Sequence, residues 1–327
     1  MTAKVRNPMF DVLKGLGIIS VIFSHVYRGG TDPLAVFVRE VAMWCVPMFF
    51  MVQGYFMSSG ASDWAQSTWK KIKKTYVPYL YWAVAYGIFF WFTAGKTFTF
   101  MDIIYGKTAL HLYYMFYYMV FAIICPLLYF LPRAIRVSTL WIMLFSNIAM
   151  NIILEISKTY HVTIFSWSGP NIIKWWGFIA IGMLLAEYPR AIEYIKNHPR
   201  QMAAAAFAVF FIGLAEPYLA GTTGYLFNKG ALFPLSVGLT LLLAIYYSTP
   251  NPLGEKFLSY VGSRTLGIYL GHFFLVDFLR IQLIPGDRAL VAVIILFTCL
   301  AVKEIKDRAK LKLFSANSVL KTRGFEG

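Results

Sequence analysis

The sequence has little charge. Only 14% of its 327 residues are Asp, Glu, Lys or Arg, whereas a soluble domain has about a quarter. Acidic residues are the scarcer kind, since 15 acids face 30 bases and the formal charge is +15. A nucleic-acid-binding protein would gather its bases on a polar surface, but here short basic clusters separate long apolar runs. The composition therefore excludes a soluble enzyme and a nucleic-acid partner, and it indicates a membrane protein in contact with the lipid bilayer.

Cysteine is also rare. Cys45, Cys125 and Cys299 each lie inside an apolar run, and their number and spacing fit neither a disulfide framework nor a zinc site. We therefore expect three small buried hydrophobic side chains and no metal. Long polar stretches are missing too, which predicts one integral-membrane domain over residues 1–327, a basic cytoplasmic tail from about 303 to 327, and no appended soluble domain.

Apolar runs are abundant. A helix needs about 20 apolar residues to cross a bilayer, and about ten runs approach that length, which predicts an all-α polytopic protein of the cell (plasma or inner) membrane. The first run follows Lys4 and Arg6 like a signal peptide, but Asp11 and Lys14 interrupt it and no cleavage site follows, so we expect an uncleaved helix. The predicted spans are 9–27, 35–57, 76–94, 109–131, 138–156, 171–186, 201–219, 230–248, 257–279 and 289–302.

The distribution of bases predicts the orientation. With ten spans both termini lie on one side, and most of the bases outside the spans fall on that side, including the lysines from Lys70 to Lys74 and the tail after Val302. Cytoplasmic loops are the ones enriched in Lys and Arg. Both termini are therefore predicted to be cytoplasmic.

Ionisable residues within the spans are costly in lipid and mark candidate functional sites. Asp11 and Lys14 are three residues apart and can pair on one face of the first helix. His25 follows Lys14 by eleven residues, which places it on the same stripe about 16 Å further along. This helix is predicted to carry a cation toward the cytoplasm and a histidine near its outer end.

Two further histidines fall at a similar depth. His111 is predicted to open the fourth span, and His272 lies a little over halfway along the ninth, so both can meet His25 in the outer half of the bundle. A histidine in a membrane helix is often a packing residue held by hydrogen bonds, and that alternative stays open for His111 and His272. The same map places three more ionisable residues near this side: Glu155, Lys174 and Asp277.

The lysine run Lys70, Lys71, Lys73 and Lys74 precedes the third span. It has two interpretations, which position and charge do not separate. One is a topology signal held by anionic lipid. The other is a clamp for the phosphates of a polyphosphate ligand arriving from the cytoplasm.

Several motifs together resemble the acyltransferase 3 family of membrane proteins. These proteins carry Arg or Lys, ten residues and then His in the first helix, and Lys14 and His25 fit that spacing. Further similar segments follow in order: Val46-Pro-Met-Phe-Phe with Gln53-Gly-Tyr-Phe, the lysine run before Pro78-Tyr79, His111-Leu-Tyr-Tyr, and Ile268-Tyr-Leu-Gly-His272. The chain departs from the family in having lysines where a pair of arginines is usual, and Gln53 where a small residue is usual.

The resemblance implies transfer of an acyl group, commonly acetyl, from cytoplasmic acyl-coenzyme A to a hydroxyl of a cell-surface or lipid-linked carbohydrate on the outer side. His25 is the candidate base or nucleophile, and Lys14, held by Asp11, is expected to bind a phosphate or the pantetheine arm. The lysine run would hold the nucleotide end of the donor. His111, Tyr113 and Tyr114 would orient the acceptor or stabilise the oxyanion, and the other predicted acceptor-side residues are His272, Lys174 and Glu155.

Two other classes of protein also place charges in membrane helices. A transporter or exporter of a glycan or lipid-linked intermediate predicts inverted repeats with broken helices, and the sequence shows no repeat. A receptor or structural membrane protein predicts no binding of coenzyme A. The acyltransferase is the preferred interpretation.

Overall fold

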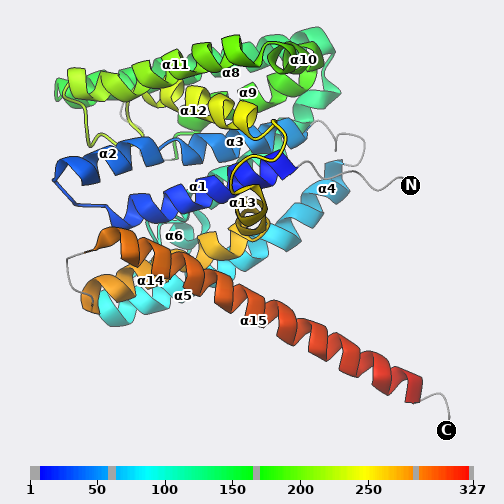
Figure 1. Cartoon of the computed structure of the whole chain (residues 1–327). Helices are drawn as coiled ribbons and strands as arrows, with labels where there is room; N and C mark the ends of the chain where they lie inside the picture. Colours follow the sequence, from blue (N-terminus) through cyan, green and yellow to red (C-terminus); the bar gives the residue numbers. More distant parts are fainter. Residues whose placement is uncertain (1–7, 58–63, 165–169, 283–286, 324–327) are drawn as a thin grey trace.

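The computed structural model describes residues 8–57, 64–164, 170–282 and 287–323, and every regular element in these ranges is a helix (Figure 1). The predicted all-α class is confirmed. The helices pack side by side around a large apolar core, in which all three cysteines are buried and free. Lys4 and Arg6, the two basic residues that precede the first predicted span, lie outside the described residues.

Six described helical segments are long and apolar enough to cross a membrane. They are Pro8–Val26, Pro33–Tyr55, Trp64–Ala94, Tyr113–Phe130, Arg133–Thr159 and Pro199–Leu219, and each overlaps one predicted span. The four remaining predicted spans fall on α9 (Ile173–Glu187), α12 (Leu232–Tyr246), α13 (Glu255–Gly262) with α14 (Thr265–Gln282), and α15 (Arg288–Arg323). The structure is thus a membrane helix bundle, while the number of ten spans and the cytoplasmic termini stay predictions.

Two of the predicted spans are broken into two helices each. The run 35–57 forms α2 (Pro33–Ala42) and α3 (Cys45–Tyr55), joined by a tight turn in which Trp44 N–H bonds Val41 O. Pro47 has no N–H to continue a helix through this turn and instead occupies the first turn of α3. The run 257–279 breaks at Ser263 and Arg264, between α13 and α14.

The lysine run lies within a continuous helical segment. The segment consists of α4 (Trp64–Lys71), a π-helical turn η2 (Ile72–Tyr76) and α5 (Val77–Ala94). Val77 N–H bonds Ile72 O, five residues back, directly before Pro78, whose missing N–H prevents the regular pattern. The widened turn changes the direction in which the lysines leave the helix relative to α5.

Glycines allow α1 (Pro8–Val26) to lie very close to α13. A Cβ at Gly262 would overlap the carbonyl oxygen of Asp11, and one at Gly15 would overlap that of Leu258. The two helices therefore meet backbone to backbone, a packing mode typical of membrane helices. This contact places the first half of α1, with Lys14, against the start of the α13–α14 pair that carries His272.

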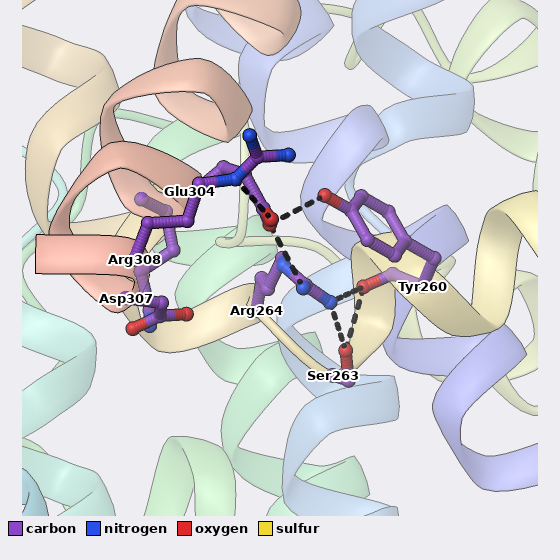
Figure 2. Close-up of polar contacts among 7 residues, drawn as sticks. Tyr260, Ser263, Arg264, Glu304, Asp307 and Arg308 are labelled. Carbon is purple, nitrogen blue, oxygen red and sulfur yellow. Dashed lines mark hydrogen bonds and ion pairs between the residues drawn. The ribbon is translucent and has the colours of Figure 1, made fainter. Parts of the chain in front are cut away.

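The last helix, α15, is tied to the junction of α13 and α14. Figure 2 shows Glu304 accepting from Arg264 at 3.3 Å, from Tyr260 at 3.2 Å and from Arg308 at 3.3 Å. The Arg264 guanidinium also lies 3.7 Å from the centre of the Tyr260 ring. Arg264, for which the sequence suggests snorkelling or a lipid phosphate, thus has a protein partner. The predicted tail from 303 begins as a helical continuation of α15, which extends beyond the other helices (Figure 1).

Candidate active site

Three histidines from distant parts of the chain meet inside the bundle. The ring of His25, on α1, lies 6.1 Å from that of His111 and 5.4 Å from that of His272, between centroids. The rings of His111 and His272 are 4.9 Å apart. Their predicted meeting is confirmed, with one correction. His111 does not open a helix but lies in the turn before α7 (Tyr113–Ile124), because the chain is not helical until Tyr113.

The hydrogen bonds of the histidine cluster, His25 with His111 and His272, are incomplete. His272 Nδ1 lies 2.8 Å from Tyr269 O and 3.2 Å from Ile268 O, and because both are acceptors, Nδ1 is assigned the proton. His272 Nε2 and both ring nitrogens of His111 are buried and have no hydrogen-bond partner among the described residues. Buried polar atoms are nearly always bonded, so these nitrogens have hydrogen-bonding capacity that a ligand or water can use.

Two buried tyrosines hold the histidines in place. Tyr269 donates its hydroxyl hydrogen bond to His111 O. Tyr86, on α5, donates to Leu270 O at 2.9 Å, accepts from Phe274 N–H at 3.0 Å, and has its ring 5.3 Å from that of His111. Neither was predicted as a site residue. The only sequence feature that could have indicated Tyr86 is a hydroxyl in the middle of an apolar span. Many other tyrosines of this chain share that feature, so it does not distinguish Tyr86.

A cavity of about 200 Å³ opens beside the histidine cluster. His25, His111, Tyr113 and Tyr114 line it, as do three side chains that were not predicted: Arg28, Arg39 and Tyr269. His272 is not part of the lining and lies behind the other two rings. The cavity therefore presents imidazole nitrogen, phenol hydroxyl and guanidinium groups in a largely apolar surrounding.

The predicted pair of Asp11 and Lys14 is confirmed, with Nζ and a carboxylate oxygen 2.6 Å apart. The pair does not line the cavity. Eleven residues of α1, about 16 Å, separate Lys14 from His25. Any ligand that contacts both residues must therefore extend along the helix.

The lysines of the run are accessible. Lys70, Lys73 and Lys74 are exposed and Lys71 is half-buried, and Lys73 lies over the Trp69 ring at 5.0 Å. The same helical segment carries Tyr86 about 20 Å further on. In Figure 1, α4 lies at the end of the bundle where α1 begins, and α5 runs toward the other end. Lys14 and the run are thus at one end of the site and the histidines at the other.

Lys174 and Glu155 lie in different surroundings from the histidines, and neither lines the cavity. Lys174 bonds Asn228 and lies 5.2 Å from the centre of the Trp175 ring. Glu155 accepts from Gly230 N–H at 2.8 Å. The sequence map placed both at the depth of the histidines, but depth along a helix does not say which side of the bundle a residue faces. Asp277, the third residue of this predicted group, lies near Tyr86.

A buried cluster of opposite charges escaped the sequence analysis. Lys229 is fully buried and pairs with Glu40, which is 1% exposed and also accepts from Gly224 N–H at 3.0 Å. Glu155 and Glu216 lie beside this pair. We call Glu40, Glu155, Glu216 and Lys229 the glutamate–lysine cluster.

No group of three or more His, Cys, Asp or Glu side chains in the described ranges is arranged to hold a metal ion. Comparison with curated proteins and with solved structures finds no match. Comparison with protein families finds the acyltransferase domain of the acyltransferase 3 family, matched over residues 7–303. Because that range contains both the lysines and the histidine cluster and covers nearly the whole chain, this membrane protein belongs to the acyltransferase 3 family.

Proposed function

We propose that the protein moves an acetyl group from cytoplasmic acetyl-coenzyme A to a hydroxyl of a cell-surface or lipid-linked carbohydrate on the outer side of the cell membrane. The observation that carries the proposal is the histidine cluster, in which buried ring nitrogens without partners lie at a cavity. Family membership supports acyl transfer, and the spatial order of lysines and histidines supports a donor entering from the cytoplasmic end.

His25 acts as the base in the simplest route. A neutral imidazole nitrogen takes the proton of the acceptor hydroxyl while its oxygen attacks the thioester carbonyl carbon. The carbon–sulfur bond then breaks, and the coenzyme A sulfur leaves as a thiol after receiving that proton. In the alternative route the imidazole first takes the acyl group and then passes it to the hydroxyl. Both routes place the thioester carbon beside His25.

The remaining cavity groups act on the acceptor and on the developing charge. Tyr113 and Tyr114 line the cavity and carry hydroxyl donors, which suits them to hold a sugar hydroxyl or the oxyanion. His111 has two ring nitrogens available for the same purpose. His272 supports the two lining rings from behind, with its tautomer fixed by the Tyr269 and Ile268 carbonyls.

The donor is held at the opposite end. Lys14, oriented by Asp11, contacts a phosphate or the pantetheine arm, and Lys70, Lys71, Lys73 and Lys74 hold the nucleotide phosphates. Lysines act as point charges and lack the bidentate grip of arginine. Binding of the donor is therefore expected to weaken strongly with added salt.

The decisive experiment replaces His25 by Ala in the full chain, in membranes, and follows labelled acetyl transfer from acetyl-coenzyme A to surface polysaccharide by mass spectrometry. Loss of general acid–base catalysis costs about 10²–10⁴-fold, and loss of a nucleophile costs at least as much. His198→Ala is the matched control, because His198 is only partly buried, bonds Tyr194 O within its own segment, and is distant in sequence from the cluster. Undiminished transfer in His25→Ala would remove this residue from the catalytic role.

Binding of the donor separates the acyltransferase from a transporter. Thermal unfolding of the purified chain is measured with and without acetyl-coenzyme A, for the wild type and for Lys14→Ala. The proposal expects a rise in the unfolding temperature that Lys14→Ala reduces. Indifference of the wild type to acetyl-coenzyme A would favour an exporter of a glycan or lipid-linked intermediate.

A further inference from the structure

Two arginines lie in the same cavity as His25, and they have no role in the chemistry described so far. Arg28 follows the end of α1, three residues after His25, and Arg39 belongs to α2. Both line the cavity, whereas no Asp or Glu is among its lining residues in the described part of the chain. The cavity therefore carries positive charge in a surrounding of aromatic and aliphatic side chains.

The two acidic residues nearest to Arg39 in sequence have other partners. Asp32 pairs with Arg288 at 2.6 Å, and Glu40 pairs with the buried Lys229. Arg39 has one hydrogen bond, at 3.4 Å from Nη1 to Gly30 O, and its buried Nε has no partner among the described residues. A half-buried guanidinium with an unused N–H is suited to bind an oxyanion through two parallel hydrogen bonds.

The position of the arginines assigns the anion to the acceptor. Arg28 lies at the end of α1 opposite Lys14, and the lysines that we assign to the donor phosphates lie at the Lys14 end. The donor phosphates therefore have cations of their own, among them Lys14, about 16 Å along α1 from His25. A second set of cations at the histidine end serves a second anion, which approaches from the other side.

We propose that Arg28 and Arg39 bind a carboxylate or phosphate group of the acceptor, so that the carbohydrate acylated by this protein is acidic. The inference rests on the proposed function and names the chemical class of its acceptor. The guanidinium groups hold the anion at one wall of the cavity, and this fixes a neighbouring hydroxyl of the same sugar near His25. Positioning of this kind selects both the sugar and the hydroxyl.

Binding of sugars tests the anion site without any acyl transfer. Purified full-length protein is titrated with glucuronate and with glucose, and binding is followed by saturation-transfer NMR. A hydrogen-bonded charge adds roughly 1.5–3 kcal/mol, which corresponds to about tenfold or more in affinity, so glucuronate is expected to bind at least tenfold more tightly. Arg39→Gln is expected to abolish the difference, Arg39→Lys to restore it in part, and the exposed control Arg190→Gln to leave it unchanged.

Equal binding of the two sugars, or preference for glucuronate that survives both Arg39→Gln and Arg28→Gln, would overturn the inference. Measurement of acyl transfer then tests the acidic acceptor separately from the acyltransferase activity. Acylation of acidic and neutral glycans at the same rate, with the arginine variants as active as the wild type, rejects the acidic acceptor and leaves the acyltransferase intact. Acylation of neither glycan, with glucuronate binding still dependent on Arg39, rejects the proposed function instead.

The last part of the test uses an acyl donor that carries its own carboxylate, and it shows whether the arginines bind the acyl group or the acceptor. If Arg39→Gln lowers transfer from succinyl-coenzyme A but not from acetyl-coenzyme A, whatever the charge of the acceptor, the anion belongs to the acyl group and the acceptor assignment is wrong. Lower transfer to acidic glycans with either donor supports it.

Discussion

The histidine cluster and the glutamate–lysine cluster are both polar groups buried in an apolar helix bundle, yet they are built in opposite ways. In the glutamate–lysine cluster, Lys229 meets Glu40, and backbone N–H groups of Gly224 and Gly230 bond the carboxylates. In the histidine cluster, three imidazole rings lie next to one another, and ring nitrogens of His111 and His272 have no hydrogen-bond partner in the part of the chain that the structure describes.

The difference separates a structural role from a functional one. Opposite charges that pair in a low-dielectric interior hold distant segments together, and Lys229 fixes the segment whose Leu226 and Phe227 form part of the cavity wall. Unpartnered buried nitrogens lower stability, and we propose that those of His111 are kept because a substrate uses them at the cavity. In this proposal one cluster supports the cavity and the other acts in it.

Removal of the charge of Lys229 is expected to have the largest effect on stability. Lys229→Met leaves Glu40 buried without its counter-ion, and breaking one partner of a buried pair costs about 3–5 kcal/mol. The measurement is the thermal unfolding temperature in detergent and the amount of protein inserted in the membrane. The double variant Glu40→Gln with Lys229→Met is the control, because it removes both charges and is expected to recover part of the loss. A Lys229→Met protein as stable as the wild type would contradict the structural role.

Replacement of His111 by Phe is expected to reduce acyl transfer without reducing stability. The variant removes two buried nitrogens that have no partner, so its unfolding temperature is expected to stay unchanged or to rise. Acyl transfer is expected to fall about 10²–10³-fold, as for loss of a donor to a developing charge. A fall in stability with normal transfer would show that His111 is a packing residue, which is the alternative that the sequence left open.

A change in helix packing away from both clusters is expected to have a moderate effect. Gly182, on α9, lies against the carbonyl oxygen of Met51 on α3, and a Cβ there would overlap it. Gly182→Ala must separate the two helices and is expected to lower stability by about 1–3 kcal/mol, with transfer per folded molecule unchanged. Gly267→Ala is the matched control, because its nearest neighbour is the flexible Lys303 side chain at 3.4 Å. Equal stability of the two variants would contradict the close α3–α9 contact.

The exposed pair of Asp32 and Arg288 is expected to matter least. The hydrogen bond from Ala35 N–H and then that from Arg288 hold the pKa of Asp32 below its usual range. A lowered carboxyl pKa stabilises the fold above the unfolded value of about 3.9, and the contribution is lost as the pH falls through the lowered pKa. At neutral pH Arg288→Gln is expected to shift the unfolding temperature less than any variant above, and the shift is expected to disappear in high salt. A shift as large as that of Lys229→Met would show that exposure does not distinguish the two pairs.

The sequence predicted the helical class and much of the histidine cluster because both depend on distance along a helix. Apolar runs fix which segments enter the membrane, and the eleven residues between Lys14 and His25 fix their separation along α1. The same reasoning could not show which partners Glu155 and Lys174 have, and neither of them lines the cavity. It also missed Arg39 and Lys229, because position along the chain does not show which polar groups lie beside them.

What the sequence determined by itself is therefore the membrane bundle, the pair of Asp11 and Lys14 one turn apart, and the depth of each histidine. Only the tertiary structure decided which polar groups share an interior. Depth follows from the rise of 1.5 Å per residue, whereas neighbours across the bundle depend on how helices turn and cross. Helix packing places Lys229 against Glu40, whereas the ring nitrogens of His111 have no hydrogen-bond partner among the described residues. This difference in packing is the reason why we assign different roles to the two clusters.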